Sequence, residues 1–150
     1  MLIDVISRVT HVTTAITLVG GCLFMGLVLL PSLKLLDDEQ RDRLTDGIRG
    51  RWKRFVHGGI ALFLISGFYN YYRAIPNHDG DGLYHALVGT KMLLALIVFF
   101  FASVLVGRSV KFEKWRQQPH FILRAMIVLS LLIVAISGFL KIRGIVEVIS

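Results

Sequence analysis

Four of the five histidines in this 150-residue chain lie in or beside long apolar stretches, where an ionisable side chain is costly and usually has a function. They are His11, His57, His85 and His120. Lys34 and Arg108 are the first cations at the ends of two of these stretches, and His11 precedes Lys34 by the same distance in sequence as His85 precedes Arg108. In two parallel helices these imidazoles would lie at one depth, where imidazole nitrogens suit the axial positions of a b-type haem iron.

The other two histidines are offset from each other. The spacing from His57 to Arg73 is about five residues shorter than the spacing from His120 to Lys141, which corresponds to about 7.5 Å along a helix. This offset is too large for one iron unless a helix tilts. Arg124 matches the depth of His57 better and is a candidate contact for a haem propionate or a lipid headgroup. A second haem at His57 and His120 therefore stays open beside an interfacial role, in which each histidine hydrogen-bonds a headgroup or water.

The phrase Ile-Ser-Gly-Phe occurs twice, at 65–68 and 136–139. It indicates an internal repeat of two helix pairs. Gly67 and Gly138 are expected near the depth of the first histidine pair, where a missing side chain leaves room for a porphyrin. The alternative is close helix packing, the usual role of small residues in membrane helices. Four cations at this end are candidates for haem propionates: Arg8, Arg73, Lys141 and Arg143.

Lysine and sulfur side chains inside the apolar stretches add two hypotheses. Lys91 either extends outward to the membrane surface or faces the interior near the first histidine pair. Cys22 and Met25 lie on one helix face, and Met92 lies within about one turn of their depth. Thiolate and thioether sulfur suit Cu(I), whereas the alternative is that these side chains are apolar filler. The single cysteine excludes an internal disulfide.

The elements that position these residues are predicted by four runs almost free of charge, at 9–33, 55–72, 83–107 and 121–140. Each has roughly the ~20 residues that a helix needs to cross a membrane. The first run is too long for a signal peptide and has no small-residue cleavage site after it, so we expect a retained helix. Short connections predict an all-α, integral membrane, up-down-up-down four-helix bundle. It would be a single domain, 1–150, with helices at about 3–34, 52–75, 82–108 and 119–142.

The charges are distributed as in a membrane protein. The chain is 55% apolar and 18% charged, with a formal net charge of +7. Seven cations lie in 34–54 and four in 108–118, whereas the loop at 73–82 has only Arg73 beside two aspartates. The positive-inside rule then predicts a bacterial inner-membrane protein with both termini in the periplasm. This placement of the charge argues against a nucleic-acid partner. The charged segment 37–54 is expected to be a short surface helix or loop, and His78 is expected to be solvated in a turn.

Three segments together resemble a known membrane domain. "HVTTAITLVGGCLFMGLVLLPSL", "RWKRFVHGGIALFLISGFYNY" and "GTKMLLALIVFFFASVLVGRS" are similar to the copper-resistance D (CopD-type) membrane domain. That domain belongs with four-helix dihaem cytochromes b and oxygen-independent protoporphyrinogen oxidases, which carry a first-helix His and a third-helix Lys. His11 and Lys91 match those two positions. His85 departs from the tighter His-x-Lys spacing of the oxidases. The resemblance implies b-haem binding with transmembrane electron transfer, or a role in copper uptake.

The sequence therefore predicts an integral membrane cytochrome b that binds one haem b, or two, and transfers electrons. Its expected partners are membrane lipid and a quinone or a periplasmic redox protein, and a homodimer stays open. The alternatives are a copper-handling protein, a haem-dependent porphyrinogen oxidase and a membrane protein without a cofactor. Whether the chain catalyses a reaction also stays open.

Overall fold

The structure, a computed structural model, describes residues 1–107 and 109–149, and in this range it is helical almost throughout and contains no strand. The all-α class predicted from the sequence is confirmed. In chain order the elements are α1 (Leu2–Phe24), η1 (Met25–Leu29), α2 (Leu30–Ser32), η2 (Leu33–Leu35), α3 (Asp38–Ala74), η3 (Ile75–His78), α4 (Gly82–Val106), η4 (Val110–Phe112), α5 (Glu113–Arg116) and α6 (Pro119–Ile149).

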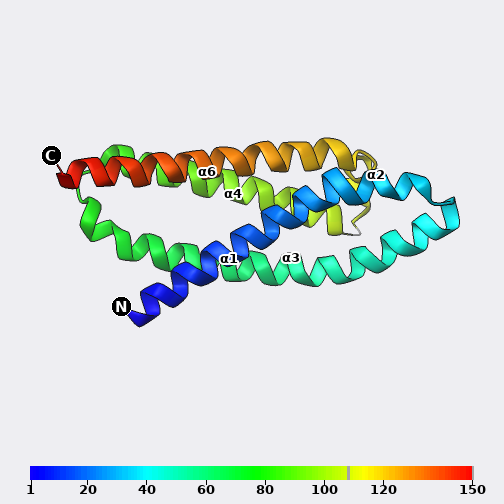
Figure 1. Cartoon of the computed structure of the whole chain (residues 1–150), viewed down its shortest axis with the longest axis horizontal. Coiled ribbons are helices and arrows are strands. Elements are labelled where there is room, and N and C mark those ends of the chain that lie inside the picture. The colour runs from blue at the N-terminus through cyan, green and yellow to red at the C-terminus, as the bar shows by residue number, and fades with distance from the viewer. Residues whose placement is uncertain (108, 150) are drawn as a thin grey trace.

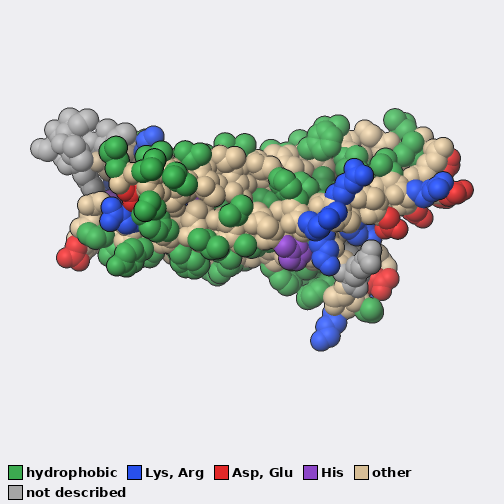
Figure 2. All heavy atoms as spheres, turned by 90° about the horizontal axis from the view of Figure 1, so that it is seen from below, with side chains coloured by type: hydrophobic (Ala, Val, Ile, Leu, Met, Phe, Trp, Pro, Cys, Tyr) green, Lys and Arg blue, Asp and Glu red, His purple; other side chains and the backbone are tan. Residues whose placement is uncertain are grey.

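Three helical stretches within the described residues are long and apolar enough to cross a membrane: Leu2–Leu35, Gly82–Val106 and Pro119–Gly144. Large apolar side chains on them are strongly exposed, among them Leu27, Leu93 and Ile142, at 60% or more of their surface. Figure 2 shows such side chains along the length of the molecule, with charged side chains gathered towards its two ends. These features indicate a membrane protein, because long helices with this much exposed apolar surface are favourable against lipid and unfavourable in water.

The first of these stretches is one continuous helical rod, to which α1, η1, α2 and η2 all contribute; below we call it helix 1. It is π-helical over Met25–Leu29, towards its C-terminal end, and the N–H of Leu30 donates to the carbonyl of Met25, five residues earlier. Pro31 follows immediately, and proline has no N–H to continue an α-helical ladder. The wider turn therefore accommodates the proline without ending the helix.

Helix α3 begins at Asp38, well before the expected start near residue 52, and runs unbroken to Ala74. The side chain of Asp37 caps it by accepting a hydrogen bond from the N–H of Gln40, at 2.8 Å. Ion pairs three residues apart, such as Arg49–Asp46, support its charged first half. The segment expected to be a short surface helix or loop is thus the first half of one long helix.

The helices pack as two antiparallel pairs, α1 with α3 and α4 with α6 (Figure 1). Contacts between α3 and α4 and between α1 and α6 join the two pairs. The most deeply buried side chains come from several helices and include Val56, Ile122 and Met126, each 1% exposed. These residues lie towards the end of the molecule where α2 and the start of α6 meet, which is the cation-rich end.

Because α1 packs closely on α3, substitutions at the neighbouring residues Gly20 and Gly21 are expected to have different effects on stability. A Cβ at Gly21 would overlap the ring of Trp52, whereas nothing lies within 4 Å of a Cβ at Gly20. We expect Gly21→Ala to lower the free energy of unfolding by about 1–3 kcal/mol through overpacking. Gly20→Ala should be neutral or stabilising, because alanine favours a helix. Unfolding of the detergent-solubilised variants, followed by circular dichroism, measures both, and equal effects would contradict this packing.

Candidate functional site

His11 is half-buried on α1 and faces α3. Its Nδ1 lies 3.1 Å from the carbonyl oxygen of Phe63 and 3.2 Å from Ser66 Oγ. A carbonyl oxygen only accepts, so Nδ1 carries the proton and donates it. Nε2 then has a lone pair, and no described residue bonds to it. Metal-binding histidines typically have this arrangement, with one nitrogen donating to a carbonyl and the other free for the metal.

Two cations lie near this imidazole. Lys91, half-buried on α4, is close enough to His11 and to Arg8 to interact with both electrostatically. Among the described residues, no acceptor or carboxylate lies within bonding distance of the Lys91 amine. Half-buried Lys91 and exposed Arg8 therefore place positive charge beside His11, and no described acid is paired with either cation. A bound carboxylate, such as a haem propionate, would balance this charge.

His85 lies nearer than His11 to the end of the molecule where α4 begins. Its Nδ1 is 3.1 Å from the hydroxyl of Tyr71, and its Nε2 is 3.0 Å from the carbonyl oxygen of His78. Tyr71 is five residues beyond Ser66 on α3, which is about 7.5 Å along the helix. On α4 it is Lys91, not His85, that interacts with His11.

The equal spacings from His11 to Lys34 and from His85 to Arg108 do not place the two histidines at one depth, because helix 1 and α4 end at different levels. Helix 1 continues well past the C-terminal end of α4 (Figure 1). Residues equally far from the two ends are consequently staggered. Both ring nitrogens of His85 are also engaged, so this histidine would have to release one hydrogen bond before it could bind a metal.

A polar cluster lies at the end of the molecule where α4 begins. Asp81 caps α4 by accepting from the N–H of Tyr84, at 3.0 Å. Its carboxylate also binds both terminal nitrogens of Arg143 on α6, each at 3.1 Å. His78, expected to be solvated, is half-buried and stacks on the ring of Tyr84, with centroids 3.6 Å apart. The turn thus ties the start of α4 to α6. The sequence indicates only one of these contacts: Asp81 lies three residues before Tyr84, the spacing at which an aspartate caps a helix.

Two of the cations proposed for propionates already have acidic partners. Arg143 pairs with Asp81, and Arg73 Nε donates to Asp4 Oδ1 at 2.9 Å. Asp4 also accepts from the hydroxyl of Tyr69, at 3.0 Å. The Asp4 contacts join the first turn of α1 to the last turns of α3, and the Arg143–Asp81 pair joins α6 to the start of α4, so both arginines have structural roles.

The cluster predicts how stability depends on pH. The N–H of Tyr84 and the guanidinium of Arg143 hold the pKa of Asp81 below its usual value of 3.8. Because the pKa is lower in the folded state than in the unfolded state, the ionised carboxylate stabilises the fold fully above the unfolded-state pKa. This contribution is lost as the pH falls through the folded-state pKa. We expect Asp81→Asn to lower the thermal midpoint at neutral pH, and the difference from wild type to shrink as the pH falls below 3.8. Asp79→Asn, at an exposed carboxylate, is the control; an equal loss there would contradict the role of Asp81.

The two glycines of the repeated phrase have different surroundings. A Cβ at Gly67 would lie 2.9 Å from Cε1 of His11, so the space there is filled by the imidazole itself. A Cβ at Gly138 would have nothing within 4 Å. Phe68 and Phe139, which follow them, are 61% and 54% exposed. Gly67 thus makes room for the histidine, and Gly138 has no comparable neighbour.

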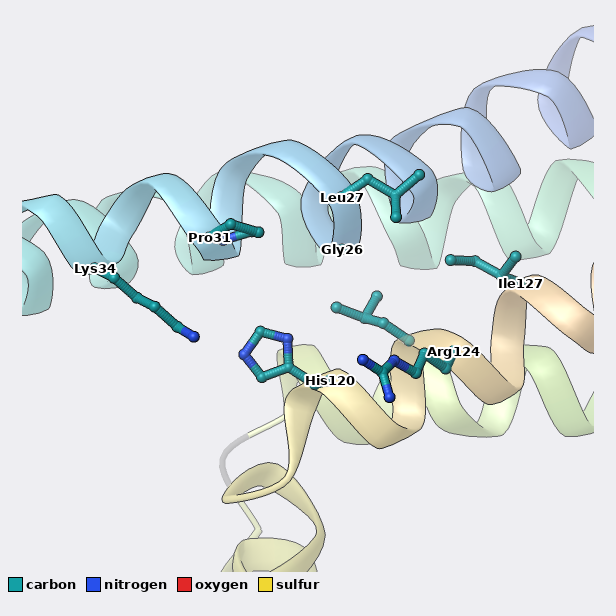
Figure 3. A pocket seen from close by; sticks show the side chains of 8 residues that line it. Gly26, Leu27, Pro31, Lys34, His120, Arg124 and Ile127 are labelled. Atoms are coloured by element: carbon teal, nitrogen blue, oxygen red, sulfur yellow. The ribbon is translucent and has the colours of Figure 1, made fainter.

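His57 and His120 are not brought into one cavity among the described residues. His57 is exposed on α3, with Nδ1 2.8 Å from the carbonyl oxygen of Lys53. His120 lines a cavity of about 480 Å³ between helix 1 and the start of α6, beside Arg124 (Figure 3). His57 does not line this cavity. A second haem at this pair stays a prediction from the sequence.

The sulfur side chains meet in a different combination from the one expected. Cys22, Met25 and Met126 line one cavity of about 130 Å³ in the core, whereas Met92 is not among its lining residues. Met126 was missed, because a methionine inside an apolar run carries no positional signal. No group of three or more His, Cys, Asp or Glu side chains within the described part of the chain is arranged to hold a metal ion.

The site that the structure assembles most completely is therefore the imidazole of His11, held at Nδ1 and free at Nε2, beside Lys91 and Arg8. Comparison of the chain with protein-family models, with curated proteins and with solved structures finds no match.

Proposed function

We propose that the chain is an integral membrane b-type haem protein that transfers electrons within or across a bacterial inner membrane. In this proposal all four long helices form an up-down-up-down bundle with both termini in the periplasm. The second half of α3 is then the fourth span, although charge in its first half and the tyrosines near its end reduce its apolar character. The cations between residues 34 and 54 would face the cytoplasm.

The observation that carries the proposal is the imidazole of His11. Its Nδ1 is held by the carbonyl of Phe63, so Nε2 is oriented and available as an iron ligand. Lys91 and Arg8 provide positive charge for propionates at the same level. Bound haem would supply one-electron redox chemistry, with its potential set by the axial ligand and its surroundings. His85 would join as a second ligand only after releasing Tyr71 or His78.

The test is the absorption spectrum of the purified protein. Protein produced in cells with ample haem should show the reduced-minus-oxidised spectrum of a b-type cytochrome, with about one haem per chain. Two haems per chain would restore the roles proposed for His57 and His120. Colourless protein from haem-replete cells would reject the function.

Copper handling is a second candidate, supported by the three sulfur side chains in one cavity. Thiolate and thioethers are the ligands that Cu(I) prefers. Titration with Cu(I) against a competing chelator would then give one bound ion per chain. Cys22→Ser should abolish this binding, whereas Met92→Leu should not, because Met92 lies outside the cavity. Loss of binding in both variants, or in neither, would exclude this site.

The interaction of Lys91 with His11 also keeps a porphyrinogen oxidase in consideration, since the resemblance implies this pair of residues for such enzymes. Anaerobic conversion of a porphyrinogen to its fluorescent porphyrin by the haem-loaded protein would distinguish this enzyme from an electron carrier.

A further inference from the structure

The cavity of about 480 Å³ between helix 1 and α6 is lined by cationic side chains towards one end and by apolar side chains towards the other (Figure 3). Lys34 extends from helix 1 towards His120 at the start of α6, and the guanidinium of Arg124 lies on the same side. Leu27 and Ile127 also line the cavity. Each lies seven residues from Lys34 or His120 on its own helix, about 10 Å further into the apolar part of the chain.

The charge of this cavity is not balanced by the protein. No carboxylate is among its lining residues. Within the described part of the chain, no ion pair or hydrogen bond involves the side chains of Lys34, His120 or Arg124. Cations from two different helices therefore face the same space without an acidic partner, and like charges held together in this way favour an anion between them.

We propose that this cavity binds the phosphate of an anionic glycerophospholipid of the cytoplasmic leaflet, with an acyl chain between Leu27 and Ile127. Three features favour a lipid over a soluble anion: the cations that line the cavity lie at the cation-rich end of the molecule, Leu27, Leu123 and Ile127 give it an apolar part, and it lies between two candidate membrane spans. Basic pockets between membrane helices on the cytoplasmic side bind anionic headgroups in this way. The inference does not depend on a haem.

The experiment is a lipid titration of the full, delipidated chain in detergent, with bound lipid counted by native mass spectrometry. Phosphatidylglycerol, phosphatidylcholine and inorganic phosphate are the three probes. We expect phosphatidylglycerol to bind at least about fivefold more tightly than phosphatidylcholine, and inorganic phosphate not to displace it. Equal binding of the two lipids would overturn the proposal, and so would displacement by millimolar inorganic phosphate, which would indicate a soluble-anion site.

Matched variants locate the site. Arg124→Gln and Lys34→Gln should each weaken phosphatidylglycerol binding about fivefold, the effect of one cation at a membrane surface. Arg54→Gln removes an exposed cation from α3 that does not line the cavity, and it should change binding less than twofold. An equal loss in Arg54→Gln would mean a general surface attraction and would overturn the site.

A second kind of variant keeps every charge. A Cβ at Gly26 would be 3.5 Å from Leu123 Cβ, an ordinary contact, so there is room for a Cβ there, and atoms beyond it would extend among the residues that line the cavity. Gly26→Leu should then fill the apolar part of the cavity and reduce phosphatidylglycerol binding with all cations in place. Unchanged lipid binding in folded Gly26→Leu protein would show that no acyl chain occupies the cavity.

Discussion

His11→Ala is expected to reduce the haem content of the purified protein to background. The substitution removes the proposed ligand nitrogen, whereas even the loss of a residue that only orients a metal ligand costs about 10–100-fold in affinity. The pyridine haemochrome assay, normalised to protein, measures the ratio directly. Circular dichroism of the same sample shows whether the helices are intact, so loss of haem can be separated from loss of fold.

Two other histidines provide the controls for this prediction. His57→Ala removes an exposed imidazole whose Nδ1 is near its own helix backbone, and it should retain haem. His85→Ala removes an imidazole with both nitrogens engaged, so we expect haem to be retained with altered spectrum or potential at most. If His85→Ala loses the haem and His11→Ala keeps it, the ligand assignment is wrong. If the wild-type protein contains no haem, the proposed function itself fails.

The membrane-spanning helices could be predicted from the sequence because the free energy of moving a helix into lipid depends on the residues of that helix alone. Each apolar residue contributes its own share, so a run of about 20 identifies a span wherever the run packs. Three of the four predicted runs meet this criterion in the structure. The fourth lies in α3, where hydropathy says little about the charged first half. There the helix depends on the cap at Asp37, with Gln40 three residues later, and on ion pairs such as Arg49–Asp46. The capping residue and the spacing of the ion pairs are visible in the sequence, but a hydropathy profile does not detect them.

The sequence could also predict which residues are candidates for the site, but not their relative depth along the packed helices. The relative depth of His11 and His85 depends on how far helix 1 extends past α4 (Figure 1), which is a property of the packed pair. The acidic partners of Arg73 and Arg143 could not be predicted from the sequence either. Arg73 and Asp4 are 69 residues apart, and Arg143 and Asp81 are 62 apart, so no local pattern joins them. Only the tertiary contact decides which cations stay available for a ligand.

The repeated Ser-Gly pair offers the second large effect, because one glycine contacts the site and the other does not. Both serines donate to the carbonyl four residues earlier, Ser66 to Leu62 and Ser137 to Ile133. The local structure of the phrase is therefore the same in both helices. The difference lies in what faces the glycine: the ring of His11 at Gly67, and open space at Gly138.

Gly67→Leu is thus expected to displace the imidazole and break its hydrogen bond to Phe63, while Gly138→Leu leaves the site intact. Overpacking at Gly67 should lower the free energy of unfolding by about 1–3 kcal/mol, and the haem content should fall with it. Gly138→Leu should stay within about 0.5 kcal/mol of wild type, as for other surface changes, and should keep its haem. Unfolding and haem content are measured on both variants together. Equal losses would mean that both glycines serve general helix packing, and that the space at Gly67 has no special relation to His11.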